Sequence, residues 1–182
     1  MELEQAVKQR HSYRGAYIQE PVPRAHLQKI MEAGLAAPSG CNKQTVSLIG
    51  IDDAELLQRL LSVMDPPTCA TAPALICVLT KHRIAYTDGN GVPRCYAVQD
   101  YSAAIENMLL TVTALGYASC WIEGHITDAD MQGKRMAEML GVPEDYELIC
   151  VLPVGIPAEE FKIPRKRPFE MRAWFNGFPE KE

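Results

Sequence analysis

The 182-residue sequence lacks the features that mark membrane, secreted and nucleic-acid-binding proteins. No apolar run approaches the roughly 18 residues that a membrane-spanning helix needs. The N-terminal stretch MELEQAVKQR is charged and contains no signal-peptide core. Basic residues are too few to cover a nucleic-acid surface, because the formal net charge is −5. We therefore expect a cytoplasmic protein without a membrane or nucleic-acid partner.

Two common cofactor motifs are also missing. The six cysteines stand at positions 41, 69, 77, 95, 120 and 150, so none forms a Cys-x-x-Cys pair and we predict no metal site. No Gly-x-Gly-x-x-Gly loop follows a strand and opens a helix, which argues against a dinucleotide resident in a Rossmann site. Cys77 and Cys150 lie in apolar runs and are expected to be small buried residues. Cys41 is interpreted as a passive small residue.

What the sequence does contain is sufficient apolar material for one core. Hydrophobic residues make up 47% of the chain, and its length suits a single domain over residues 1–182. Apolar spacing predicts helices near residues 2–10, 23–35, 53–61, 97–115 and 127–140. Strands are predicted at residues 46–51, 74–80, 118–122 and 147–153. This alternation favours an α+β fold of three layers with a central sheet that is mostly antiparallel or mixed.

Three segments refine this picture. The run at 74–80 is continuously apolar, so the strand should be covered on both faces. Residues 81–94 contain the turn signal Asp88-Gly89-Asn90-Gly91 and form either a pair of short strands or a lid. The tail at 169–178 is unusually apolar for a terminus. We expect it to reach a second subunit, and docking on its own subunit is the alternative.

Basic and amide-rich clusters suggest a cofactor. Arg10-His11-Ser12-Tyr13-Arg14 closes the first helix, and Arg165-Lys166-Arg167 lies near the C-terminus. Guanidinium groups bind phosphate through paired, permanently charged donors. Between the clusters, residues 37–44 read Ala-Pro-Ser-Gly-Cys-Asn-Lys-Gln, and amides in such a loop suit the edge of a planar heterocycle. Together they indicate a phosphorylated aromatic cofactor, best matched by FMN. The alternative is that the basic clusters are solvated surface.

The order of these motifs resembles the nitroreductase family of flavin-dependent oxidoreductases over nearly the whole chain. The family opens with a helix ending in a basic-Ser-basic motif, which Arg10, Ser12 and Arg14 match. Its second helix ends in Ala-Pro-Ser-Gly-x-Asn-x-Gln, the pattern of residues 37–44. The chain closes, as family members do, on Pro-Val-Gly-Ile-Pro at 153–157 followed by a basic run.

The resemblance implies a nitroreductase-like fold in an intertwined homodimer that binds FMN. It further implies hydride transfer from NAD(P)H through the flavin to a nitroaromatic, quinone or similar small acceptor, in a ping-pong mechanism. A reductive dehalogenase-like member of the same fold, or a non-enzymatic flavin-binding redox sensor or storage protein, is the alternative.

The resemblance also assigns roles to residues. No side chain is expected to be catalytic, because the flavin carries the hydride. Arg10 and Arg14 would approach the ribityl phosphate, with Ser12 near the ribityl or pyrimidine side. Arg165 and Arg167 would hold the phosphate. His11 is a weaker candidate for cofactor binding. The ring would be contacted by backbone at Ile122, Glu123 and Gly124, and by the second subunit's loop, namely Pro38, Ser39, Gly40, Asn42 and Gln44. Many relatives have Gln-Pro-Trp where this chain has Gln44-Thr45-Val46, which alters the surroundings of the ring.

Overall fold

The centre of the molecule is an antiparallel sheet of three strands. The computed structural model describes residues 1–64, 69–127 and 131–178. The strands β1 (Val46–Ile51), β2 (Ala74–Thr80) and β5 (Glu147–Val154) lie in the order β1-β2-β5. Every residue of β2 is buried, which confirms the prediction from its continuous apolar run. The predicted bounds of β1 and β2 are also confirmed.

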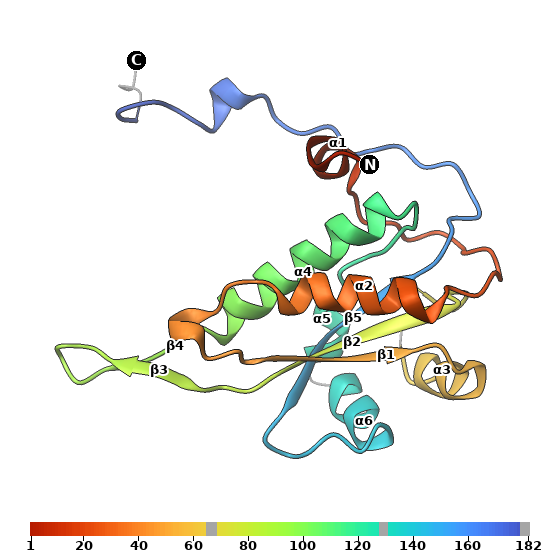
Figure 1. Ribbon diagram of the computed structural model, residues 1–182, viewed down its shortest axis with the longest axis horizontal. Coiled ribbons are helices and arrows are strands. Elements are labelled where there is room, and N and C mark those ends of the chain that lie inside the picture. The colour runs from red at the N-terminus through yellow and green to blue at the C-terminus, as the bar shows by residue number, and fades with distance from the viewer. Residues whose placement is uncertain (65–68, 128–130, 179–182) are drawn as a thin grey trace.

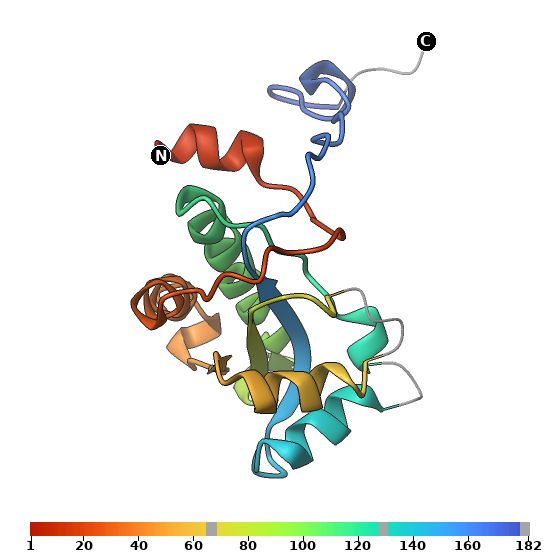
Figure 2. The same ribbon diagram turned by 90° about the vertical axis from the view of Figure 1, so that its right-hand side faces the viewer.

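Helices cover both faces of this sheet, so the fold has three layers (Figures 1 and 2). On one face α2 (Arg24–Leu35) and α4 (Ala97–Ala114) pack against Ile76 and Val78. On the other face α3 (Ala54–Leu61) and α6 (Gln132–Met139) pack against Leu75 and Cys77. The side chains of successive β2 residues thus point into opposite helical layers, as the two-residue period of a strand requires. The predicted α+β architecture is confirmed.

Short local signals set several helix ends as predicted. The Asp53 carboxylate accepts a hydrogen bond of 2.8 Å from the Leu56 N–H and caps α3. Gly116 has a φ of +84° just after α4, a conformation that glycine adopts at little cost. At the N-terminus α1 (Leu3–Gln9) buries Ala6 but leaves Leu3 and Val7 exposed.

Two predictions between α4 and β5 were wrong or lie partly outside the described residues. Residues 118–122 form no continuous strand, because their isolated bridges go to two different segments, one at Ser12 and the other at Val151 and Gly155, in and directly after β5. The short helix α5 (Gly124–Thr127) was not predicted. The helix expected from residue 127 begins as α6 at Gln132, and residue 128 lies outside the described ranges.

The segment predicted at 81–94 contains a pair of short strands, one of the two alternatives. The strands β3 (Ile84–Thr87) and β4 (Pro93–Cys95) pair antiparallel, and Figure 1 shows them projecting away from the main sheet. The Asp88 carboxylate fixes the turn, since it accepts bonds from the N–H groups of Asn90 and Val92 and pairs with Arg94.

The C-terminal segment leaves the body of the molecule and runs past α1 (Figure 1). It includes a 3₁₀ turn, η2 (Phe169–Met171), and its aromatic side chains are open to solvent: Phe175 is 82% exposed and Phe178 is 76% exposed. The tail therefore does not dock on the core of its own subunit. Among the described residues, no helix is long and apolar enough to cross a membrane.

Candidate functional site

The predicted site residues are arranged along α4. The 38–44 loop contacts Asp100, Glu123 contacts Tyr101, and Arg10 contacts Glu106. Because an α-helix rises 1.5 Å per residue, Asp100 and Glu106 lie about 9 Å apart along the axis. The helix therefore positions three of the predicted segments along its length.

The basic segment after α1 lies against residues 118–120. The Tyr13 N–H donates to the Ser119 carbonyl at 2.8 Å, and Ser12 forms a parallel bridge with Ser119. The Arg10 guanidinium, with a side chain 23% exposed, lies 3.0 Å from the Glu106 carboxylate. Burial raises the pKa of the Cys120 thiol, while the positive charge of Arg14 opposes that shift and so lies nearby. Arg10, Ser12 and Arg14 are thus gathered at one place.

A cavity of about 290 Å³ opens beside this segment and is lined by Arg10, His11, Ser119 and Phe161. The His11 ring stacks on Phe161 at a centroid distance of 3.8 Å, so His11 is part-buried although a histidine at such a position is usually exposed. Within the described residues, His11 Nε2 and Ser119 Oγ are buried without a hydrogen-bond partner. The Nδ1 atom of His11 lies 2.8 Å from the Gln9 carbonyl oxygen and must donate to it, so Nε2 is an acceptor in the neutral ring, while the Ser119 hydroxyl can donate. Buried polar atoms are rarely left unpaired, so the cavity offers an acceptor and a hydroxyl that a polar ligand can satisfy.

The amide-rich loop has an unusual backbone. It contains the 3₁₀ turn η1 (Gly40–Asn42), and Cys41, Asn42 and Gln44 have φ angles of 50°, 52° and 48°. Non-glycine residues seldom adopt such angles. The Ser39 hydroxyl accepts a bond of 2.9 Å from the Gln44 N–H, and the side chains of Asn42 and Gln44 point to solvent. The loop therefore displays its amides on an exposed surface, next to the exposed Pro38.

The backbone at 122–124 is held on two sides. Ile122 exchanges hydrogen bonds with Val151 of β5, and Gly124 begins α5. The Glu123 carboxylate accepts from the Tyr101 hydroxyl at 3.0 Å and from the Trp121 indole N–H at 2.7 Å. Burial, together with that hydrogen bond to Glu123, raises the pKa of Tyr101 to about 12.

The C-terminal arginines lie in an exposed, extended segment. Arg165 and Arg167 are exposed in the extended segment, and among residues 1–64, 69–127 and 131–178 neither makes an ion pair. The same segment nevertheless passes the Arg10 cavity, because Phe161 and Ile163 line it.

Sequence reasoning missed the residues that support the predicted ones. Asp100, Tyr101 and Glu106 fall in an apolar helix pattern, and Ser119 lies in a small-residue run. The sequence signal for Asp100 was an acidic residue four positions before an apolar one, Ala104, so that both lie on the buried side of α4.

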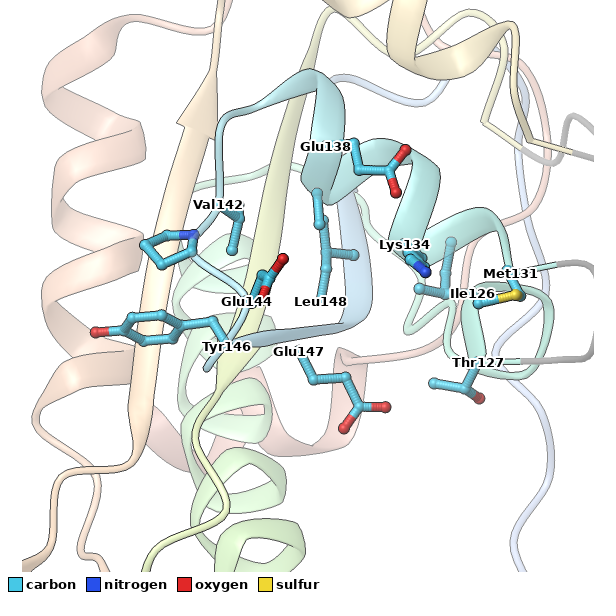
Figure 3. A pocket seen from close by; sticks show the side chains of 12 residues that line it. Ile126, Thr127, Met131, Lys134, Glu138, Val142, Glu144, Tyr146, Glu147 and Leu148 are labelled. Atoms are coloured by element: carbon cyan, nitrogen blue, oxygen red, sulfur yellow. The ribbon is translucent and has the colours of Figure 1, made fainter.

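A second cavity, of about 620 Å³, lies between α6 and the start of β5 (Figure 3). Ile126 and Leu148 form apolar lining, while Lys134, Glu138 and Glu147 contribute charge. It contains none of the predicted residues and no arginine, so its chemistry does not suit a phosphate. Within the described part of the chain, no group of three His, Cys, Asp or Glu side chains is placed to hold a metal ion.

Comparison with known proteins gives consistent matches. The model of the Nitroreductase family matches residues 7–65 and 61–156. A protein of Archaeoglobus fulgidus, named as a candidate NADH dehydrogenase/NAD(P)H nitroreductase, is 29% identical over 161 residues, covering 87% of this chain and 88% of that protein. The structure of an FMN-dependent nitroreductase of Clostridium difficile R20291 matches with a TM-score of 0.76 and 27% identity, covering 95% of this chain and 98% of that one. A candidate nitroreductase of Desulfovibrio desulfuricans in complex with FMN matches with a TM-score of 0.77 and 27% identity, over 98% and 99% of the two chains.

Proposed function

The chain belongs to the nitroreductase family, and from this premise we propose that it is an FMN-dependent oxidoreductase. It would pass hydride from NAD(P)H through the flavin to a nitroaromatic, quinone or similar small acceptor, in alternating half-reactions. The observation that carries the proposal is the cavity beside Arg10, where His11 Nε2 and Ser119 Oγ lack a partner among the described residues. The guanidinium and the Ser119 hydroxyl are donors of the kind that a ribityl phosphate requires.

The residues present fit FMN at both ends. Arg10, Ser12 and Arg14 would meet the ribityl phosphate, with Arg165 and Arg167 as its second set of charges. At the ring end, the amides of Asn42 and Gln44 would contact the heterocycle. Bound FMN would supply the hydride chemistry at its N5 atom, and the chain binds, orients and polarises it.

The backbone of Ile122, Glu123 and Gly124 would lie along the N5 edge of the ring. Among the described residues, the Glu123 N–H donates no hydrogen bond to another backbone group. A fixed N–H at this place stabilises charge that develops on the ring. The carboxylate of the same residue is anchored by Tyr101 and Trp121, which holds that N–H in place.

The proposal includes an intertwined homodimer in which residues 1–182 act as one flavin-binding domain and each 38–44 loop serves the partner's flavin. Its support is the exposed apolar surface at one end of the molecule, on α1 at Leu3 and Val7 and on the tail at Phe175 and Phe178. Removing Trp174 and all later residues should lower dimer mass and flavin content together. A monomer with full flavin occupancy would contradict the dimer proposal.

Spectroscopy of the purified protein tests the function. The protein should carry the visible absorbance of flavin, which anaerobic NADH or NADPH should bleach and a nitroaromatic or quinone should restore. A protein that binds no flavin would refute the cofactor assignment. Flavin that bleaches but is not restored by any such acceptor would favour a sensor or a store over an enzyme.

A further inference from the structure

Asp100 is a buried carboxylate that contacts Gly40 within the amide-rich loop and Thr45 directly after it. Its side chain lies in the first turn of α4, and the residue is only 4% exposed. One oxygen accepts from the Gly40 N–H at 2.8 Å, and the other accepts from the hydroxyl of Thr45, a residue 2% exposed, at 2.7 Å. No ion pair to Asp100 is found among the described residues. Its two oxygens are thus committed to the loop.

The loop between these two contacts is strained. Cys41, Asn42 and Gln44 all have positive φ angles, and none is glycine. Such angles persist only where the surroundings over-determine them, and they cluster at functional sites. The ring of Tyr96, the residue before α4, lies close against Gly40, because a Cβ on Gly40 would be only 2.5 Å from it. The beginning of α4 therefore imposes a shape that these residues would not adopt on their own.

We infer that Asp100 is a positioning residue for flavin, whose carboxylate holds the loop in the strained shape that presents Asn42 and Gln44 to the ring. The inference rests on the proposed function, because the loop is assigned to the flavin there. Asp100 would not touch the cofactor. It acts through the backbone of Gly40 and the hydroxyl of Thr45.

The chemistry of the contact makes conservative and disruptive replacements differ. In Asp100→Asn, the amide oxygen can still accept from the Gly40 N–H, while the amide nitrogen can donate to a Thr45 hydroxyl that has rotated to accept. In Asp100→Leu, the size is similar but both donors lose their acceptor. In Thr45→Val, the shape is kept and one of the two contacts is removed.

The test measures the affinity of apo-protein for FMN and for riboflavin, well below the melting temperature of each variant. Asp100→Leu should weaken both ligands equally, by about tenfold or more, because a hydrogen bond to a charged group is lost at the ring end. Thr45→Val should weaken both by roughly threefold to tenfold on the same basis. Asp100→Asn should stay within about threefold of the wild type, since both contacts can re-form. Ser102→Ala is the matched control, because among the described residues this hydroxyl bonds within α4, to the Val98 carbonyl.

A purely structural role predicts a different result. Asp100→Leu and Thr45→Val would then lower the melting temperature and still bind both ligands as the wild type does, and this outcome would overturn the inference. If Asp100→Leu does not fold, Thr45→Val decides alone. Wild-type protein that binds neither ligand would instead refute the proposed function, so the two failures are distinguishable.

Discussion

The Glu123 carboxylate has two donors that can each be removed while an aromatic ring is kept. Tyr101→Phe deletes the hydroxyl that lies 3.0 Å from one oxygen. Trp121→Phe deletes the indole N–H that lies 2.7 Å from the other, together with part of the ring. We expect both changes to lower the free energy of unfolding and to loosen the backbone that would meet the flavin N5 edge.

The structure sets the size of the effect. A hydrogen bond to a charged group contributes about 1.5–3 kcal/mol. Glu123 is half-buried, so water can replace part of each contact, and we expect about 1.5 kcal/mol per donor. For a chain of this length, that loss lowers the melting temperature by roughly 3–6 °C. The double variant should lose less than the sum, because the two donors share one carboxylate that can then turn to solvent.

Urea unfolding of the four proteins in this double-mutant cycle measures the stability, and stopped-flow reduction by NAD(P)H measures the flavin chemistry. The reduction rate should fall roughly tenfold, less than the loss of a transition-state donor costs, because the N–H is loosened and not removed. Tyr146→Phe is the control for the rate, since that ring lies under Lys81, away from the predicted site. A double variant with wild-type stability and wild-type reduction rate would refute the anchoring role of Glu123.

Three further changes test separate parts of the molecule. Arg167→Ala should weaken FMN binding about thirtyfold and leave riboflavin binding unchanged in fluorescence quenching, because only FMN carries the phosphate; equal FMN affinity would show that the C-terminal cluster is solvated charge. Cys41→Ser should keep the rate of flavin reduction within about threefold, whereas a hundredfold loss, about 2.7 kcal/mol of barrier, would reveal a catalytic thiol. Burial raises the pKa of the Cys77 thiol from 9.0 to about 12, so the folded state holds this proton more tightly than the unfolded state. The resulting stability is complete below pH 9.0 and is lost as the pH rises toward 12. Between pH 9.0 and 12, Cys77→Ala should make the fall in the free energy of unfolding with pH shallower by up to about 1.4 kcal/mol per pH unit, as measured by urea unfolding. An unchanged slope would contradict the raised pKa.

The sequence predicted those parts of the fold that depend on local signals. The apolar run of β2, the Asp53 cap and the turn at Gly116 each act within a few residues, so they could be recognised without tertiary information. Residues 118–122 could not, because their backbone bonds go to segments far apart in the chain. Strand formation there depends on neighbours and not on propensity.

The same distinction applies to the site. Arg10 and the amides of Asn42 and Gln44 could be proposed as cofactor-binding groups from residue type and motif. Asp100 and Tyr101 do not, since an acid in the first turn of a helix is common and a tyrosine in an apolar pattern resembles core. Their importance follows from contacts with residues about 60 and 22 positions away in the chain, which only the folded structure shows.

In the proposed homodimer, the charges at the two ends of the chain would link cofactor binding to assembly. The Arg10 charge is already shared with Glu106, while Arg165 and Arg167 are exposed on a segment that its own subunit does not bury. A phosphate must therefore compete with Glu106 for Arg10 and gains most from arginines that a docked tail would fix in place. A ligand that binds only the assembled form stabilises that form, and the coupling is reciprocal. Flavin affinity should then rise with protein concentration through the range where dimers form, which gel filtration and fluorescence quenching on the same dilution series would measure. A flavin affinity that is the same for monomer and dimer would show that the tail does not contribute to phosphate binding.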